Sequence, residues 1–312
     1  MYFLKIRVKW IFGRSSKDMG ILIGVLEQGF IYGIMALGVY ITYKILDFPD
    51  LTTDGSFPAG AAVTAVLLTG GMNPYISILI SFAVGMIIGA LTGIIHVKFK
   101  VRDLLSGIIM MTALYSINLR IAGKANVPLF NQETVFENAL VNGLFPASMA
   151  KYQTVIIAFV LAVISKLLLD AYLKTKSGFL LRAVGNNENL VTSLAKDIGL
   201  VKIVGLAIAN GLIAMSGSIM CQQQRFFDVS MGTGTVVIGL ANVIIGTNVF
   251  KNISFVKATT AVIIGSVVYK GCVALAISHG LSATDMKFIT AFLFLIILII
   301  TMDRKKKVKK NA

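Results

Sequence analysis

The sequence predicts an all-α polytopic membrane protein with about 8–10 transmembrane helices, in two pseudo-repeats with broken or re-entrant helices. Composition is the first indication: 56% of the 312 residues are hydrophobic, 14% are charged and the mean hydropathy is +0.84. A soluble domain carries about 25% charged residues. The second indication is a series of apolar runs close to the length needed to cross a bilayer. The third is a pair of acidic breaks between such runs.

Apolar runs account for the predicted helices. They lie at about 20–43, 56–71, 74–95, 104–122, 153–170, 199–221, 233–249, 254–277 and 287–302. The second and seventh are short for a full span, and each follows an acidic break, which indicates half-helices or re-entrant segments. Within the third run, Gly85, Gly89 and Gly93 recur every four residues. That spacing predicts a close helix–helix contact, although membrane helices are rich in glycine in any case.

Two polar breaks occupy matching places in the chain. The first runs from Asp47 to Pro58 and holds three of the fourteen acidic residues. The second runs from Phe227 to Gly234, about 178 positions later. Ionisable groups beside membrane helices are costly and often mark a substrate or ion path. Matched breaks in two halves are typical of transporters built by duplication.

The order of runs and breaks predicts an internal repeat within one transmembrane domain, 20–302. Repeat 1 covers about 20–120, repeat 2 covers about 199–302, and a linker helix with a loop fills 123–198. Chance similarity between two hydrophobic stretches is the alternative explanation. If the halves run in opposite senses, the repeat is inverted, as in many transporters.

The net charge of +15 is concentrated near the chain ends and in short loops between spans. Basic residues that flank spans follow the positive-inside rule and attract anionic membrane lipid. Nucleic-acid binding is disfavoured because aromatic residues are not interleaved with the basic ones. We therefore expect a basic cytoplasmic extension at 1–19 and a basic cytoplasmic tail at 303–312. Counting spans back from that tail places the N-terminus outside. A cytoplasmic N-terminus requires either one re-entrant element, for which 56–71 is the candidate, or an extra crossing.

Carboxylates and hydroxyls at the two breaks form the predicted substrate path. They are Asp50, Thr52, Thr53, Asp54, Asp228 and Ser230. Two roles stay open for them: contact with an ammonium group of a solute, or capping of half-helix ends, where the helix dipole favours aspartate. An ion-coupled secondary transporter that uses Asp50, Asp54 and Asp228 is the alternative function. Neither a catalytic constellation nor metal-ligand spacing surrounds the two histidines and two cysteines, so we predict no catalytic or metal site.

The connection 171–198 is predicted to carry a short amphipathic cytoplasmic helix. Asn187 or Asn189 can cap this helix, and Gly199 can end it before the next span. One helix face is apolar because branched residues recur every four positions: Leu190, Leu194 and Ile198. Such a face needs a groove on a partner or, as the alternative, the bilayer surface.

Several motifs resemble the permeases of bacterial ABC importers, specifically the branched-chain amino acid and ribose type family. Leu181-Arg-Ala-Val-Gly-Asn-Asn187, followed by Asp197-Ile-Gly199, is similar to the family's ATPase-coupling loop. Phe48-Pro-Asp-Leu-Thr-Thr-Asp-Gly-Ser-Phe57 is similar to the tryptophan-type branch, which is associated with aromatic amino acid uptake. The resemblance covers essentially 20–302.

This resemblance implies the permease subunit of an ATP-driven importer for amino acids or a related small polar solute, in the bacterial plasma (inner) membrane. It implies three partners: a cytoplasmic ATP-binding subunit, an extracytoplasmic solute-binding protein and a second permease copy, identical or not. The chain has no Gly-x-x-x-x-Gly-Lys-Ser/Thr loop, so ATP and Mg are expected on the partner ATPase and the chain is not expected to be an enzyme. The residues implied in ATPase coupling are Arg182, Gly185, Asn186, Asn187, Glu188, Leu190, Leu194, Asp197 and Gly199.

Overall fold

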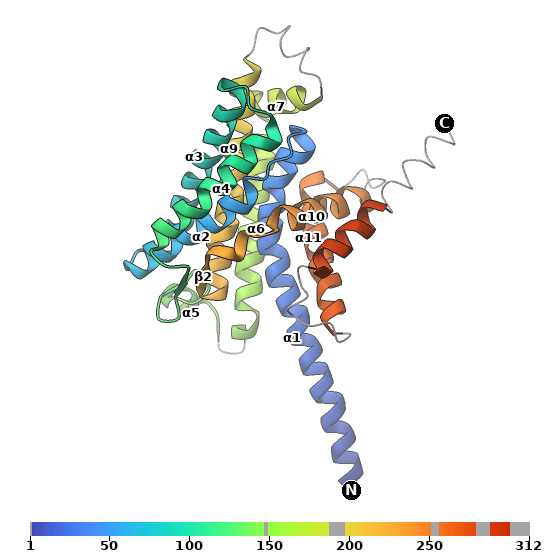
Figure 1. The fold of residues 1–312 in the computed structure, drawn as a ribbon. Coiled ribbons are helices and arrows are strands. Elements are labelled where there is room, and N and C mark those ends of the chain that lie inside the picture. Colours follow the sequence, from blue (N-terminus) through green and yellow to red (C-terminus); the bar gives the residue numbers. More distant parts are fainter. Residues whose placement is uncertain (1, 147–148, 187–196, 251–255, 279–287, 300–312) are drawn as a thin grey trace, which may run out of the picture.

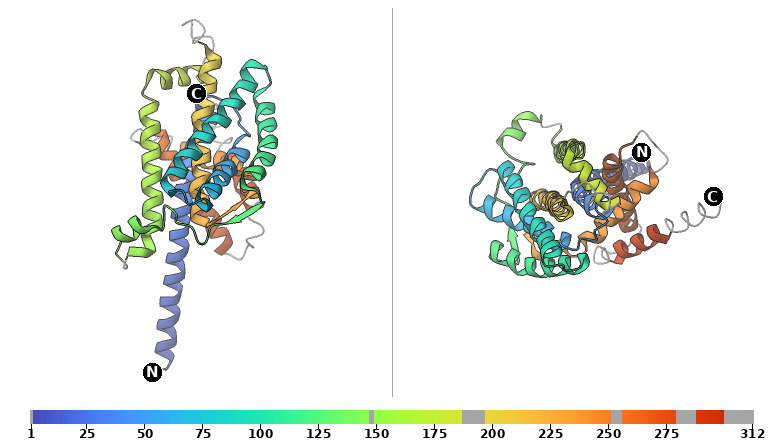
Figure 2. Two further views of the ribbon diagram at one scale, coloured as in Figure 1. Left: turned by 90° about the vertical axis from the view of Figure 1, so that its left-hand side faces the viewer. Right: turned by 90° about the horizontal axis from the view of Figure 1, so that it is seen from above.

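The computed structural model describes residues 2–146, 149–186, 197–250, 256–278 and 288–299. These residues form a bundle of helices with one small two-stranded ribbon, so the predicted all-α membrane fold is confirmed (Figures 1 and 2). Seven helices of the described part are long and apolar enough to cross a membrane. The tail at 303–312 lies outside the described residues.

The elements follow the predicted runs closely. The first half contains helix α1 (Tyr2–Val39), a π-helical turn η1 (Tyr40–Ile45), α2 (Thr53–Thr69), α3 (Pro74–Lys98) and α4 (Asp103–Ala122). The middle contains strand β1 (Asn126–Pro128), α5 (Ala139–Leu144), α6 (Ala150–Tyr172) and α7 (Lys176–Asn186). The second half contains α9 (Ile198–Gln224), strand β2 (Phe226–Asp228), the 3-10 turn η3 (Val229–Gly232), α10 (Thr235–Val249) and α11 (Ala258–Ser278), followed by a short apolar helix, Phe288–Ile299.

Local signals in the sequence explain where several helices start and stop. Asn73 precedes a proline, and its side chain accepts the backbone N–H of Tyr75 at 2.9 Å, which caps α3. Gly123, with φ of 71°, ends α4 in the left-handed conformation that glycine adopts without strain. The two short runs give short helices, since α2 has 17 residues and α10 has 15. Only together with η3 does the α10 segment reach a 21-residue candidate span.

Helix α1 crosses the bundle from one end to the other. Glu27 in the second half of α1 accepts a hydrogen bond from Gln223 at the end of α9, whereas η1, which follows the C-terminal end of α1, lies against Gly185 of α7. The N-terminus therefore lies at the end of the bundle opposite α7 (Figure 1). The run at 56–71 was the candidate re-entrant element, but it does not turn back. Helix α2 leads to Pro74, whose carbonyl accepts a hydrogen bond from Gln222, and Gln222 lies at the end of α9 that is opposite α7. The segment 1–19 and the connection that contains α7 were both predicted to be cytoplasmic, but they lie at opposite ends of the bundle.

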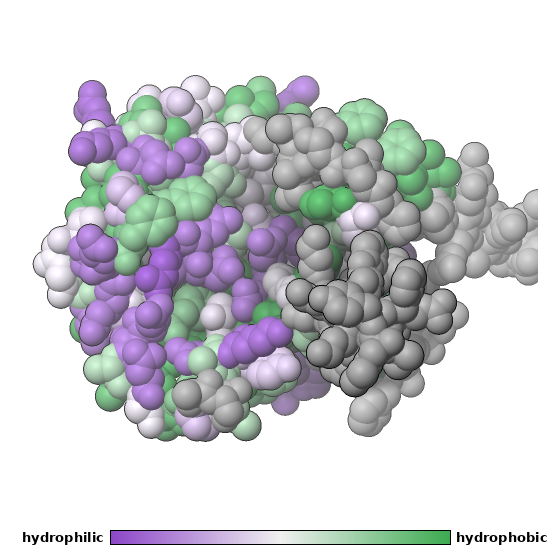
Figure 3. All heavy atoms as spheres, turned by 90° about the horizontal axis from the view of Figure 1, so that it is seen from below, coloured by the Kyte–Doolittle hydropathy of each residue, from purple (hydrophilic) through white to green (hydrophobic). Residues whose placement is uncertain are grey.

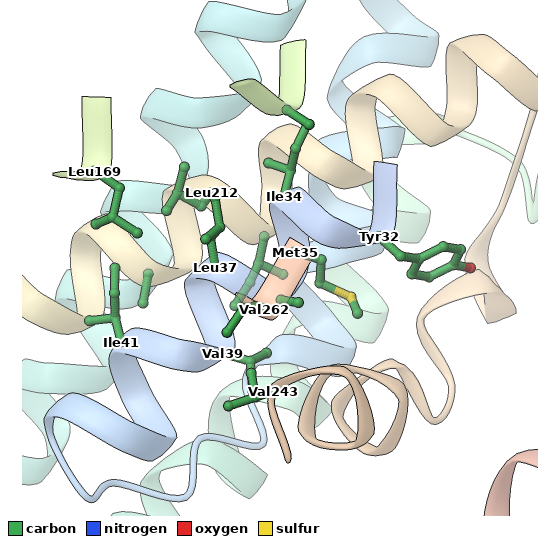
Figure 4. Packing of buried hydrophobic residues seen from close by; sticks show 14 of the residues in the cluster. Tyr32, Ile34, Met35, Leu37, Val39, Ile41, Leu169, Leu212, Val243 and Val262 are labelled. Atoms are coloured by element: carbon green, nitrogen blue, oxygen red, sulfur yellow. The ribbon is translucent and has the colours of Figure 1, made fainter. Parts of the chain in front are cut away.

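The core surrounds α1 and α9, which lie side by side in the middle of the bundle (Figure 2). Ser216 of α9 donates a hydrogen bond to the carbonyl of Ile31 in α1 at 2.7 Å. Buried residues of α1 also meet α6, α10 and α11, as Leu169, Val243 and Val262 illustrate (Figure 4). Lipid is as apolar as leucine, so close backbone approach and buried polar contacts hold such helices together more than apolar burial does.

The predicted glycine face of α3 is confirmed. A Cβ at Gly85 would lie 2.4 Å from the carbonyl oxygen of Asn210, and one at Gly89 would lie 2.1 Å from that of Leu206. A Cβ at Gly93 would lie 2.8 Å from the Cα of Ile203. All three contacts are with α9, so the glycine spacing is a helix–helix interface and not a general enrichment in glycine.

Candidate functional site: two helix breaks and an exposed end helix

The first break starts with a buried aspartate. Asp50 is 4% exposed, and its Oδ1 accepts the backbone N–H of Thr52 at 2.9 Å. Its Oδ2 accepts the side-chain amide of Asn210 in α9 at 2.8 Å. The same amide group accepts a hydrogen bond from Ser56 at 2.7 Å. Asp50 therefore caps the turn before α2 and fastens that turn to α9.

Asp54, in the first turn of α2, caps a different helix. Its Oδ1 accepts the backbone N–H of Val236 at 2.7 Å and the hydroxyl of Thr235 at 2.9 Å, and its Oδ2 accepts the N–H of Gly234 at 2.9 Å. These donors form the first turn of α10, where a negative charge is favourable. Gly234 has φ of 85°, a conformation suited to glycine, and precedes that helix. The two breaks therefore meet at one carboxylate.

The second break is more exposed than the first. Asp228 Oδ1 accepts the backbone N–H of Ser230 at 2.7 Å, which repeats the geometry of Asp50 with Thr52. Its Oδ2 accepts the side chain of Asn126 at 3.4 Å, beside the β1–β2 pairing. Partial burial raises the pKa of Asp228, but the hydrogen bonds from Ser230 and Asn126 outweigh it and hold that pKa below its usual value. Asp228 therefore stays ionised as the cap of η3.

The hydroxyls predicted for the path have separate surroundings. Thr52 is buried and shares a hydrogen bond with Thr92 of α3 at 3.1 Å, while the Thr53 hydroxyl donates to the carbonyl of Asp50 at 3.1 Å. Ser230 is exposed, and its hydroxyl also contacts Asp228. The structure thus brings Asp50, Thr52 and Thr53 together at the buried start of α2 and leaves Ser230 on the surface.

A cavity of about 240 Å³ lies between the two breaks and α4. Asp54, Asn118, Tyr115 and Thr233 are among the residues that line it. Asn118 is fully buried, and its amide donates to the carbonyl of Gly55 at 3.1 Å. Its Oδ1 has no hydrogen-bond partner within the described part of the chain. Asn118 was not predicted to lie at the path, because an asparagine in an apolar run equally suits a helix–helix contact.

The coupling region begins with an ordered helix at one end of the bundle. In α7, Leu181 and Val184 are buried, whereas Arg182 is exposed and Phe179 is 61% exposed. Gly185 is packed closely, since a Cβ there would lie 1.7 Å from the carbonyl oxygen of Ile45. The exposed aromatic side chain of Phe179 was not among the predicted coupling residues, although an aromatic residue in the connection 171–198 is a usable signal.

The rest of the coupling region is described only in part. Asn187, Glu188, Leu190 and Leu194 lie outside the described residues, and Asn186 is the last residue of α7. Asp197 is exposed and caps α9, accepting the N–H groups of Gly199 at 2.8 Å and Leu200 at 3.3 Å. Gly199 therefore lies inside the first turn of α9. The expectation that it ends the preceding helix was wrong, because Asp197 starts the new helix two residues earlier.

The described residues contain several candidate spans, two interrupted helices that meet at an interior aspartate, and a helix exposed at one end. These features are those of a membrane transport permease. The chain belongs to the family described as "Branched-chain amino acid transport system / permease component", whose model matches residues 21–302. It is thus an ABC permease, a transport component of a multi-pass kind found in the bacterial inner membrane.

Individual relatives agree with this assignment. The chain is 47% identical to the "Tyrosine transport system permease protein" of Clostridioides difficile, over 88% of this chain and 89% of that protein. It is 27% identical to a "Probable branched-chain amino acid transport permease protein LivH" of Methanocaldococcus jannaschii, over 71% and 72% of the two chains. It is 24% identical to the "Ribose import permease protein RbsC" of Escherichia coli K12, over 72% and 68%. No solved structure gave a significant match.

Proposed function

We propose that this permease imports an amino acid, with an aromatic amino acid such as tyrosine as the first candidate, and that ATP hydrolysis by a partner subunit drives the import. The relative from Clostridioides difficile, which is named for tyrosine transport, supports the choice of solute. Family membership supports the assembly: a cytoplasmic ATPase, an extracytoplasmic binding protein and a second permease copy, all in contact with membrane lipid.

The exposed face of α7 is the observation that carries the coupling proposal. Phe179 and Arg182 are three residues apart and therefore share one helix face. Both are exposed, while Leu181 and Val184 anchor the opposite face. An aromatic and an arginine side chain are typical anchors of a protein–protein interface. We propose that this face, with Asn186 and the segment that follows it through Asp197, contacts the ATPase.

The cavity between the breaks is the proposed passage for the solute. Its lining includes Asp54 and Asn118. A carboxylate beside a cavity suits the ammonium group of an amino acid. The Asp54 carboxylate also holds the first turn of α10, so a solute that contacts it would disturb the junction of the two broken helices.

An ion-coupled carrier is the weaker candidate. Asp50 and Asp54 already accept hydrogen bonds from amide and hydroxyl groups of their own chain. A bound Na⁺ would have to displace those donors, because hard cations take several oxygen ligands at short range. An ammonium group needs only a single further acceptor position, and a carboxylate has about four of them.

Co-purification of the ATPase tests the coupling proposal. The ATP-binding subunit of the transport system is co-expressed with tagged permease, either wild type, Phe179→Ala or Arg182→Glu. Lys151→Ala, an exposed lysine at the start of α6, is the control. We expect the two α7 variants to retain at most about a tenth of the ATPase, since interface anchors contribute about 2 kcal/mol or more each. Full recovery with both α7 variants would overturn the proposal.

A further inference from the structure

A second cavity, of about 380 Å³, lies at the end of the bundle opposite α7. It is bounded by α1, by the connection between β1 and α6, and by the ends of α6 and α9, through residues such as Glu27, Glu137, Gln153, Gln223 and Arg225. Hydrophilic residues gather on this end of the molecule (Figure 3). This cavity is distinct from the one beside Asp54, since the two linings share no residue.

Glu27 is the unusual group in this cavity. It is a half-buried carboxylate within the apolar span Met19–Ile45. The side-chain amide of Gln223 donates to it at 3.2 Å. No salt bridge to Glu27 occurs among the residues that the structure describes. A carboxylate in an apolar span is costly unless it is paired. A neutral amide solvates the charge of Glu27 but does not neutralise it, so Glu27 can still pair with a cation.

The cationic side chain in the cavity lining is Arg225. Its guanidinium pairs with Glu137 and donates to the carbonyl of Phe130 at 3.3 Å. Arg225 has φ of 60°, a left-handed conformation that is uncommon outside glycine. This conformation ends α9 and turns the chain into β2. Strain of this kind is often found where a side chain must be held at a functional position.

Part of the cavity wall is held in place by two buried glutamines. Gln222 is buried, accepts the backbone N–H of Val135 at 2.9 Å and donates to Ser77 at 3.2 Å. Gln153 donates to the carbonyl of Phe136 at 2.6 Å. The connection around residues 134–138 is thereby fastened to α3, α6 and α9. A preorganised wall reduces the entropy lost when a ligand binds.

From this arrangement we propose that the cavity binds a zwitterionic amino acid, with the ammonium group on Glu27 and the carboxylate group on Arg225. A volume of about 380 Å³ is sufficient for a single amino acid. The proposal rests on the proposed function, because it assigns the receiving site of the same solute on the face opposite the ATPase. The site also extends the proposed function, since selectivity for a zwitterion would then lie partly in the permease.

Binding to the isolated permease tests this site without any ATPase. Wild-type permease in nanodiscs is titrated with L-tyrosine, with tyramine, which lacks the carboxylate, and with 3-(4-hydroxyphenyl)propionate, which lacks the ammonium group. We expect L-tyrosine to bind most tightly and each analogue to bind at least about tenfold more weakly, because each loses one charge-assisted contact. Absence of L-tyrosine binding at millimolar concentration, or equal binding of all three compounds, would overturn the proposal.

Variants then identify the residues. Glu27→Gln keeps the size of the side chain and should weaken L-tyrosine binding about tenfold, while Glu27→Asp should weaken it less. Glu133→Gln removes an exposed carboxylate of the same connection that does not line the cavity, and should bind as wild type does. Size-exclusion profiles confirm that each variant is folded. Unchanged affinity of Glu27→Gln for L-tyrosine would refute the site, even if the complete transporter imports tyrosine. Absence of tyrosine import by the wild-type transporter and by every variant would instead refute the proposed function.

Discussion

Asp54 in α2 accepts the backbone N–H of Val236 in α10 at 2.7 Å, across 182 positions of sequence. The carboxylate of Asp54, which belongs to α2, therefore caps the N-terminal end of α10. Gly232 lies against the same turn, since a Cβ there would be 2.1 Å from the carbonyl oxygen of Asp54. The two breaks form one structural unit, and a change at either is expected to reach the other.

Replacement of Asp54 tests that unit. Asp54→Asn exchanges one acceptor oxygen for an NH₂ group that faces the N–H groups of α10. We expect a loss of about 1–2 kcal/mol in the free energy of unfolding, as for other lost helix caps. Thermal unfolding in detergent measures it. Asp47→Asn is the control, because Asp47 is exposed and its φ of 51° suits asparagine. Equal stability of the two variants would show that the cap contributes nothing.

Asp50 and Asp228 occupy matching turns but different surroundings. Asp50→Asn removes the acceptor of the Asn210 amide in a buried site, and we expect a loss of about 2 kcal/mol or more. Asp228→Asn changes an exposed cap and should cost less than about 1 kcal/mol. Unfolding and solute uptake are compared for both variants. Similar defects in both would argue that the matched pair acts together in transport and that burial does not set the effect.

The glycine face of α3 predicts a steric effect. Gly89→Ala places a methyl group against the carbonyl of Leu206 and should destabilise the protein by about 1–3 kcal/mol, because the helices must separate. Gly24→Ala in α1 has no atom within 4 Å of the added Cβ and should be neutral or slightly stabilising. Thermal unfolding distinguishes them. A stable Gly89→Ala variant would contradict the packing of α3 on α9.

Lys270 in α11 is a buried cation among apolar helices. It is 7% exposed, donates to Gln28 at 3.2 Å and lies 3.9 Å from the centre of the Tyr32 ring. These contacts offset only part of the desolvation penalty of an ammonium group. We therefore expect Lys270→Met to raise the free energy of unfolding by about 1 kcal/mol or more, with Lys151→Met, on the surface, unchanged. A less stable Lys270→Met variant would mean that the ring contact outweighs desolvation.

The span pattern could be predicted because the bilayer imposes a length on every crossing helix. The runs at 74–95, 104–122 and 153–170 correspond to α3, α4 and α6 within a few residues. The aspartates at the breaks were also identifiable, since charged groups between apolar runs stand out from the composition. Their capping role was one of the two roles left open by the sequence.

The partners of these aspartates could not be predicted. Asp54 sits at the start of α2, so local rules assign it to its own helix, and nothing near it in sequence points to α10. Gly199 was misassigned for a similar reason, because a glycine after an amphipathic stretch suggests a helix end. The sidedness of the N-terminus depends on whether α2 turns back, and that depends on contacts between Pro74 and Gln222 that are far apart in sequence.

Energised uptake tests the central claim most directly. Proteoliposomes that contain the permease, its ATPase and its binding protein are loaded with ATP, and uptake of radiolabelled L-tyrosine is followed with ionophores that collapse all ion gradients. We expect uptake to require internal ATP, to persist without gradients and to be lost in Phe179→Ala and Arg182→Glu. Uptake that follows an imposed Na⁺ or H⁺ gradient without ATP would contradict it.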